Sequence, residues 1–433
     1  MKIKKKEVGI TLIALVITVI VLLILAGVTI AALSGDNGIL TRAKEAKEKT
    51  EQAQDNESKI LSNMENILES YKFENINTAD TNPAGAMPSD GTILENDANK
   101  GIVIKDKNEN EWVWIEVPKT TVFTDLSIDT TQELTEQNYN DIKNKLVTYA
   151  ATYRKGSATQ NENWTDEWYA KDGEVLVTES TANLTDVQKK LTNGCGLTYN
   201  EYKIEYQKML KSVYTYGGFW IGRYEAGIEG SIEDVSKART AHTDIKIGQS
   251  PKAISQKDAI PYNFIYCSEA QDLAKEMTPS SSYTSSLMFG IQWDLACKFL
   301  EVKSTLTTAD INSDSTSWGN YSDIERTITG KKAKQSTNDG NSWKTITEIK
   351  PARGIILSTG ASEETRKMNI YAFAGNEWEW TLEHAISNDN NLCAFRGGSY
   401  YNLGNGDSAA HRYNYNISES YSIIGFQTIF YVD

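Results

Sequence analysis

Histidine and cysteine are scarce in this chain of 433 residues. It contains three histidines and four cysteines, and no two cysteines are close enough in sequence to form a CxxC motif. Structural zinc sites are normally built from such paired ligands, so the sequence predicts no metal site and no cofactor. The cysteines at positions 195, 267, 297 and 393 leave two possibilities open. They form two disulfides in one of three connectivities, or they are four buried free thiols.

Catalytic motifs and excess positive charge are also missing. The sequence shows no Ser-His-Asp arrangement, no GxSxG motif and no phosphate-binding glycine-rich loop, which predicts a protein that is not an enzyme. The formal net charge is −14, and because Met1–Gly9 contributes +3 from four lysines and one glutamate, the remainder carries −17. Such a chain repels phosphate backbones, so nucleic acid is not an expected partner.

One long hydrophobic run is present near the N-terminus. Ile10 to Leu33 comprises 24 residues without a charge, about 36 Å of helix at about 1.5 Å per residue, which is enough to cross a bilayer. Four lysines precede the run, so we expect the N-terminus to stay cytoplasmic and the remainder to lie outside the cell. A simple signal anchor and a cleaved secretory signal are alternatives.

The residues around this run carry a family resemblance. Basic residues, a glycine and an apolar helix that begins "ITLIALV" resemble the prepilin-type signal of type IV pilins and pseudopilins. The resemblance implies that a prepilin peptidase cuts after Gly9, that Ile10 becomes the first mature residue, and that the helix packs with other pilin subunits in a fibre. The family usually has a glutamate that assists assembly at the fifth mature position, where this chain has Ala14.

The segment after the apolar run predicts a second helix. It lacks proline from Asp36 to Tyr71, and its apolar residues from Ile60 onward recur at spacings of three and four. The following "NTADTNPAGAMPSDG" is rich in helix-breaking residues. The predicted layout is therefore a leader at 1–9, a transmembrane helix at 10–35, an amphipathic stem at 36–75, a linker at 76–100 and an outer domain at 101–433.

Short aromatic motifs characterise the outer domain. "NENEWVWIEVP" has the alternation of a strand, and "GNEWEW", "RGGSY" and "GFQ" follow towards the C-terminus. Their order resembles the formylglycine-generating-enzyme, or sulfatase-modifying-factor, domain, a variant of the C-type lectin fold. The resemblance implies an α+β fold in which a pilin-like transmembrane helix precedes a C-type lectin-type domain. A poorly matched insertion lies at about 120–212.

The resemblance does not extend to the family's functional residues. Oxidase members bind copper through two cysteines after "GGSY", and Asn402 and Asp407 occupy those positions here. Because Cu(I) selects thiolate ligands, an oxidase is the least favoured function. The family's calcium site includes an asparagine where this chain has Ala372, so Glu379 is predicted to be a buried, hydrogen-bonded structural carboxylate. Trp378 and Trp380 are predicted to pack in the core.

The C-terminal segment from Ser399 to Ser422 has an unusual composition. Of its 24 residues, 14 are Asn, Tyr or Ser, the residues that antibody loops use because Tyr gives rigid contact area and Ser and Asn give adaptable hydrogen bonds. In a lectin-type fold this segment would be the exposed ligand-binding face. A polar surface loop without a ligand is the alternative.

In its expected fold, its position at the C-terminus and its composition, the segment resembles the variable segment in the variable proteins of diversity-generating retroelements. Adenine mutagenesis of Asn codons in that family yields Tyr, Ser, Asp and His, the mixture seen here. The resemblance implies these variable, ligand-binding positions: Tyr401, Asn402, Asn405, Asp407, Ser408, His411, Tyr413, Asn414, Tyr415, Asn416, Ser418, Ser420 and Tyr421. The sequence thus predicts a cell-surface, membrane-tethered adhesin-like protein that binds a protein or glycan. A structural minor pilin or pseudopilin is the rival interpretation.

Overall fold

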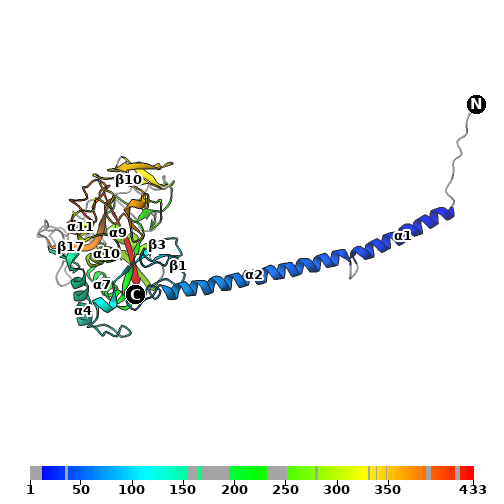
Figure 1. Cartoon of the computed structure of the whole chain (residues 1–433), viewed down its shortest axis with the longest axis horizontal. Helices are drawn as coiled ribbons and strands as arrows, with labels where there is room; N and C mark the ends of the chain where they lie inside the picture. Colours follow the sequence, from blue (N-terminus) through cyan, green and yellow to red (C-terminus); the bar gives the residue numbers. More distant parts are fainter. Residues whose placement is uncertain are drawn as a thin grey trace, which may run out of the picture. The chain divides into compact units, whose positions relative to one another are not determined.

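A computed structural model describes most of the chain. The described residues are 12–34, 38–154, 163–167, 195–231, 251–277, 281–329, 332–337, 339–347, 349–386, 392–414 and 420–433. The chain divides into an N-terminal unit, Met1–Tyr71, and an outer unit, Lys72–Asp433. Figure 1 shows both units along the chain.

Two helices make up the N-terminal unit. Helix α1 spans Leu12–Ser34 and helix α2 spans Ile39–Asn75. An apolar N-terminal helix is therefore present, and among the described residues it is the one helix long and apolar enough to cross a membrane. Its described apolar side chains are exposed, which suits a helix whose backbone hydrogen bonds are internal and whose surface faces lipid. Gly9 and Ile10 lie outside the described residues.

The outer unit is mixed α/β and contains a six-stranded sheet of order β1-β2-β3-β5-β21-β9. Its strands are β1 (Thr92–Glu95), β2 (Val103–Lys105), β3 (Glu111–Glu116), β5 (Gly218–Gly222), β21 (Thr428–Val432) and β9 (Tyr283–Leu287). All its pairings are antiparallel. The last strand of the chain therefore lies inside the sheet, between β5 and β9.

Aromatic residues hold this sheet against its core. Trp112 on β3 contacts Phe430 with ring centroids 4.8 Å apart, and Trp114 contacts Trp220 at 4.9 Å. All four side chains are buried. Fully burying a side chain of this size stabilises the fold by about 2–3 kcal/mol, so the aromatic strand motif predicted from the sequence is core structure.

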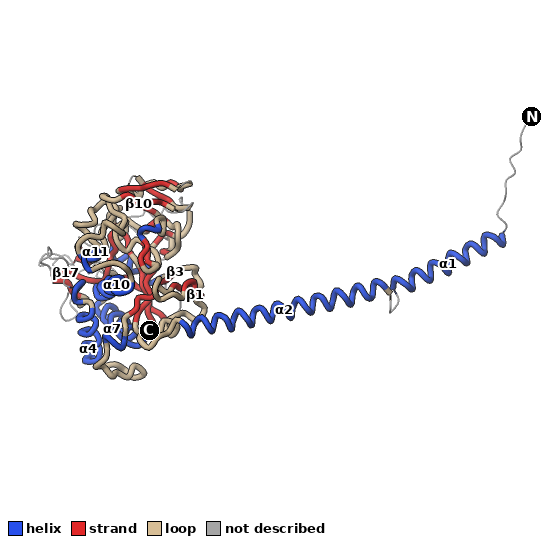
Figure 2. Tube along the Cα trace, viewed as in Figure 1, coloured by secondary structure: helices blue, strands red, loops and turns tan. Residues whose placement is uncertain are grey.

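Helices pack beside the six-stranded sheet. Helix α7 (Tyr199–Tyr216) contacts β5 and β21, α9 (Cys267–Glu276) contacts β9, and α10 (Gly290–Lys303) contacts β3. Figure 2 shows α4 and α7 together, at the opposite end of this unit from β10. The other helices of the described segments are α3 (Lys119–Val122), α4 (Glu136–Tyr149), α5 (Ala151–Arg154), α11 (Thr308–Asn312) and the 3-10 turn η2 (Glu363–Thr365).

A second sheet carries the motifs near the C-terminus. Its order is β19-β18-β17-β20, and β4 pairs with the far end of β17. The strands are β4 (Asn163–Thr165), β17 (Trp378–Ile386), β18 (Leu392–Arg396), β19 (Arg412–Asn414) and β20 (Ile424–Phe426). Strand β20 runs parallel to β17 and the other pairings are antiparallel.

Smaller sheets complete the outer unit. Two of them are three-stranded, with the orders β7-β6-β8 and β12-β11-β14. Two more are two-stranded, one formed by β10 and β13 and the other by β15 and β16. Their bounds are β6 (Gly227–Ile228), β7 (Ala253–Ile254), β8 (Ile260–Pro261), β10 (Glu325–Ile328), β11 (Lys334–Ser336), β12 (Lys344–Thr345), β13 (Lys350–Arg353), β14 (Ile356–Leu357), β15 (Arg366–Lys367) and β16 (Ile370–Tyr371).

Segment 76–100, predicted to be a linker, is packed onto the outer unit. Strand β1 pairs with β2, and Ile76, Ala86 and Met87 are buried. Trp220 Nε1 donates to the Ala86 carbonyl at 2.9 Å, and the Tyr283 hydroxyl donates to the Met87 carbonyl at 2.7 Å. Buried indole and phenol groups need acceptors, so a segment with the composition of a loop became part of the fold.

Candidate functional site

The predicted ligand-binding segment starts and ends on the second sheet. It leaves the end of β18, forms a loop, returns along β18 as β19, and reaches β20 through Ser422. In the β18–β19 pairing Arg396 lies opposite Arg412, and Phe395 lies opposite Tyr413. Both ends of the 397–411 loop are thereby held on neighbouring strands.

Two glycines shape the start of the loop. Gly397 has φ +98° and Gly398 has φ +76°, values that favour glycine because other residues lose energy there. A Cβ on Gly398 would lie 2.2 Å from the Asp407 carbonyl oxygen, so the two ends of the loop touch at this point. The Tyr321 hydroxyl donates to the Gly397 carbonyl at 2.9 Å. "RGGSY" is therefore a rigid turn that only glycine permits.

A buried cluster of charges lies beneath the loop. Arg396 donates to Asp294 at 2.6 Å and to Glu383 at 2.7 Å, and Arg412 donates to the same two carboxylates. Three arginines and three carboxylates balance one another in this charge cluster, five of them on different helices and strands and the sixth, Asp166, directly after β4. Its members are Arg154, Asp166, Asp294, Glu383, Arg396 and Arg412.

The charges of the cluster depend on one another. Burial alone would raise the pKa of Glu383, but the charges of Arg412, Arg396 and Arg154 outweigh burial and lower the pKa to about 2. A buried charge is costly unless partners of opposite sign satisfy it. The folded state therefore requires all partners to be in place, and this requirement positions both strands that carry the loop.

Asn402 fastens the middle of the loop. Its Oδ1 accepts from Trp378 Nε1 at 2.9 Å, and its Nδ2 donates to Asp407 Oδ2 at 2.8 Å. The Asn402 carbonyl accepts from the Ser322 amide at 2.8 Å. Asn402 and Asp407 are thus in contact, and an amide and a carboxylate offer no thiolate to a copper ion.

The predicted ligand-binding residues differ in exposure. Tyr401 is 72% and Tyr413 is 48% exposed, and Asn405 is exposed too. Asn402, Asp407, Asn414, Ser420 and Tyr421 are half-buried, whereas Ser408 and His411 are buried. Tyr415, Asn416 and Ser418 lie outside the described residues. Leu403, which the composition does not single out, is 53% exposed between Tyr401 and Asn405.

His411 and Asp407 form a partly shielded pair below this exposed surface. His411 Nε2 lies 3.5 Å from Asp407 Oδ1. Burial first, and then the charges of Arg396 and Arg412, lower the pKa of His411 to about 4. Burial also raises the pKa of Asp407, against the hydrogen bond from Asn402. At neutral pH the imidazole is therefore uncharged, and it belongs to the support of the loop.

The two tryptophans of "GNEWEW" anchor β17 as the sequence predicts. Trp378 and Trp380 are 3% and 0% exposed, which confirms that they are core residues. Trp380 Nε1 donates to the Ile265 carbonyl at 2.9 Å, and Trp378 Nε1 donates to Asn402. Trp378 therefore links the core directly to the loop.

Glu379 is buried as predicted, but the prediction that it is hydrogen-bonded is wrong. Neither carboxylate oxygen has a hydrogen-bond partner among the described residues. The indoles on either side donate elsewhere, and β17 is paired on both edges by β18 and β20. Burial, followed by the charges of Glu225 and Glu377, raises the pKa of Glu379 well above its usual value. Its surroundings therefore disfavour the charged form of the carboxyl group.

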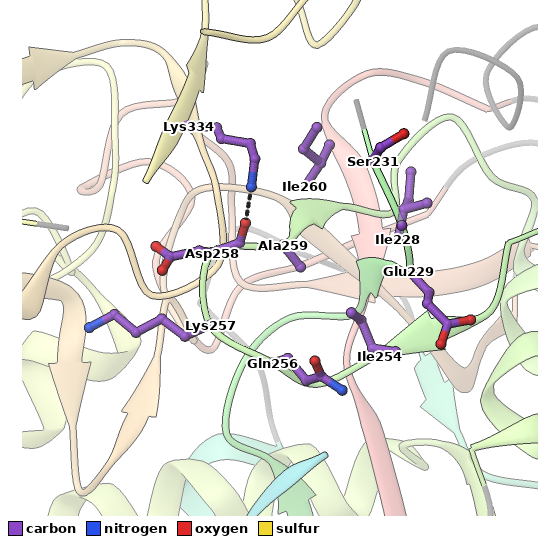
Figure 3. Close-up of a pocket in the computed structure, with 11 residues that line it drawn as sticks. Ile228, Glu229, Ser231, Ile254, Gln256, Lys257, Asp258, Ala259, Ile260 and Lys334 are labelled. Carbon is purple, nitrogen blue, oxygen red and sulfur yellow. Dashed lines mark hydrogen bonds between the residues drawn. The ribbon is translucent and has the colours of Figure 1, made fainter. Parts of the chain in front are cut away.

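A pocket of about 270 Å³ lies away from the loop, lined by β6, β7, β8 and the start of β11. Figure 3 shows Lys334 reaching the Asp258 carbonyl, with Lys257 and Glu229 on opposite sides of the view. Burial lowers the pKa of Lys334. Of the predicted ligand-binding residues that the structure describes, none lines this pocket.

Sequence reasoning missed most members of the charge cluster. Arg154 and Asp166 come from the poorly matched insertion at about 120–212. Asp294 lies in helix α10, and Glu383 follows the tryptophan motif. Charged residues inside apolar stretches, as in "GIQWDLACKF", are the signal that could have indicated Asp294.

Comparison with known proteins yields weak structural similarity. No protein-family model and no curated protein matches the chain. Among solved structures, CarF is similar at 16% identity and a TM-score of 0.31, over 50% of this chain and 87% of CarF. Treponema denticola variable protein 1 is similar at 13% identity and a TM-score of 0.27, over 49% of this chain and 84% of that protein. Similarity at this level carries no argument about function.

Proposed function

We propose that the chain is a surface-displayed, non-catalytic protein that binds a protein or glycan through segment 399–422. The observation that carries the proposal is that this segment combines exposed side chains with a backbone that hydrogen bonds hold to the core. Tyr401, Leu403 and Tyr413 expose large side chains, while the backbone between them is fixed to the core. A rigid backbone lowers the entropy cost of binding, and exposed tyrosines supply contact area.

The fixed points of the loop are close together. The Gly404 carbonyl accepts from the Ser315 amide at 2.9 Å, and the Ala409 carbonyl accepts from Trp293 Nε1 at 2.9 Å. The exposed side chains of Tyr401 and Asn405 can change without disturbing this support, whereas the side chains of Asn402 and Asp407 are part of it. This favours a lectin-type domain with a retroelement-diversified face, because diversification requires that many different side chains be tolerated at a fixed backbone.

We expect the retroelement origin to be visible in DNA. The region next to the gene should hold a near-repeat of the gene's 3′ end and a reverse transcriptase gene, and sibling genes should differ at adenines of the predicted codons. The structure sharpens this expectation: Tyr401, Asn405 and Tyr413 should vary most, and buried Ser408 and His411 should vary only among side chains that fit. A uniform 3′ end without a reverse transcriptase would instead favour a structural minor pilin.

We also expect the outer unit to lie outside the cell, tethered by α1. The motivation is the uncharged run Ile10–Leu33 behind four lysines. Protease treatment of intact cells should remove the outer unit. The intact mass of the untreated protein should equal that of a chain whose first residue is Ile10. A unit that resists the protease until lysis would contradict the topology. Retention of Met1 would contradict prepilin-type processing and leave a simple signal anchor.

A further inference from the structure

Three of the four cysteines gather at one place in the core of the outer unit. Cys195, Cys267 and Cys393 are all completely buried, although they come from distant parts of the chain. Cys297 lies elsewhere, on α10 beside Arg396 of the charge cluster. The three gathered thiols are not explained by the predicted binding function.

Of these three cysteines, Cys267 and Cys393 are the pair considered first, because Thr381 on β17 lies beside both. Cys267 is the first residue of α9, and its Sγ lies 3.6 Å from the Thr381 carbonyl on β17. The Thr381 hydroxyl in turn donates to the carbonyl of Ala394 at 2.8 Å, next to Cys393 on β18. Thr381 therefore touches both the Cys267 thiol and the residue next to Cys393, which makes the two thiols neighbours between α9 and β18.

Cys195 is a neighbour of this pair. Gly196 has φ +73°, and a Cβ there would lie 2.8 Å from the Ser268 carbonyl oxygen. The segment with Cys195 is therefore packed against the first turn of α9. Its thiol is a neighbour of those of Cys267 and Cys393, and the hydrogen bonds of the described residues include none from it to either thiol.

His384 lies directly opposite Cys393 in the β17–β18 pairing. Its side chain hydrogen-bonds the Cys393 thiol and acts to lower the pKa of Cys393, although burial raises that pKa well above the usual value. His384 is itself 2% exposed, and its ring packs 5.6 Å from that of Tyr202. An imidazole at this position can accept the proton that Cys393 must lose to become a nucleophile.

We infer that Cys267 and Cys393 are a disulfide-forming pair that joins α9 to β18, while Cys195 and Cys297 remain thiols. The oxidant is a small-molecule disulfide such as oxidised glutathione. One cysteine thiolate attacks it, forming a mixed disulfide and releasing one thiol. The second thiolate attacks the mixed disulfide, closing the Cys267–Cys393 bond and releasing the other thiol. Two protons and two electrons leave the pair, and the oxidant is reduced to two thiols.

Burial decides when this bond can form. Both thiols are inaccessible in the folded unit, and burial raises the pKa of each. The oxidant must therefore react while α9 and β18 are still separating or docking. Once closed, the bond would cross-link residues far apart in sequence, which strongly restricts the unfolded chain. It would also hold the strand that leads into "RGGSY".

The test is disulfide mapping on the full-length chain in detergent, folded with oxidised glutathione and then denatured and alkylated with iodoacetamide. We expect one linked peptide pair, containing Cys267 and Cys393, with Cys195 and Cys297 alkylated. The link should persist in Cys195→Ser and Cys297→Ser and be absent from Cys393→Ser. Wild type refolded with reductant in place of oxidised glutathione should have a Tm about 5 °C below that of the oxidised wild type, and Cys393→Ser should melt alike after either treatment.

Either of two results would overturn the inference. One is alkylation of all four cysteines in the oxidised wild-type sample, and the other is a linked peptide that contains Cys195 or Cys297. The wild-type map needs no variant to fold, so it decides the matter even if Cys393→Ser is unstable. The result is also independent of ligand binding and of membrane topology, because the chain is folded in vitro.

Discussion

Replacing Trp380 by alanine should lower the free energy of unfolding of the outer unit by about 3–5 kcal/mol, whereas replacing Tyr401 and Tyr413 together should change it by about 1 kcal/mol or less. Trp380 is fully buried, so its truncation leaves a cavity. Tyr401 and Tyr413 are 72% and 48% exposed, and surface substitutions usually stay within about 0.5 kcal/mol each. Thermal and denaturant melting of both variants measures the difference.

The same tyrosine variant should lose ligand binding. Tyrosine anchors at interfaces commonly contribute 2 kcal/mol or more, about 30-fold in affinity. Binding can be measured on immobilised glycans and on cell-envelope proteins, with the wild type and Ile204→Ala as references, because Ile204 is 52% exposed on α7. Unimpaired binding, or melting as severe as that of Trp380→Ala, would show that these tyrosines are not the binding surface.

Tyr421 should not be included in that variant. It is half-buried and packs against the core, and its carbonyl accepts from the Phe264 amide at 3.0 Å. Its truncation would mix a loss of packing with a loss of binding. The structure thus divides the predicted face into side chains that are mostly exposed and side chains that mainly support the fold.

Replacing Glu383 by glutamine should destabilise the outer unit by about 3–5 kcal/mol. The substitution keeps the size of the side chain but leaves Arg154, Arg396 and Arg412 with one carboxylate fewer, and removing one partner of a buried ion pair leaves charge uncompensated. Asp125→Asn is the matched control, because Asp125 pairs with Lys145 at 2.7 Å on the surface and is 74% exposed. Exposed pairs contribute about 0–1 kcal/mol.

Lowering the pH should also destabilise the wild-type outer unit, because it protonates Glu383. The folded pKa of Glu383 is lowered to about 2 from 4.5, so its contribution is fully present above pH 4.5 and is lost as the pH falls towards 2. The Glu383→Gln variant should lose less stability over this range than the wild type. Equal melting of Glu383→Gln and Asp125→Asn would contradict a structural role for the charge cluster.

Features that depend on neighbouring residues could be predicted from the sequence. The apolar helix follows from 24 uncharged residues in succession. The buried tryptophans follow from the alternation around Glu379, since successive side chains of a strand point to opposite faces and large aromatic residues favour burial. The concentration of Asn, Tyr and Ser between two rigid motifs predicts an exposed face, and among its described residues Tyr401, Asn405 and Tyr413 are exposed.

Only the tertiary structure decided which charged and polar side chains are enclosed. Ser408 and His411 have the same composition signal as Tyr401 but are buried, because both lie where the loop returns over the core. Arg154 meets Glu383, and Cys267 meets Cys393, across more than a hundred residues of chain. Local sequence sets backbone preference and side-chain period. The burial of a charge or a thiol depends on partners brought from distant elements, and those partners exist only once the chain has folded.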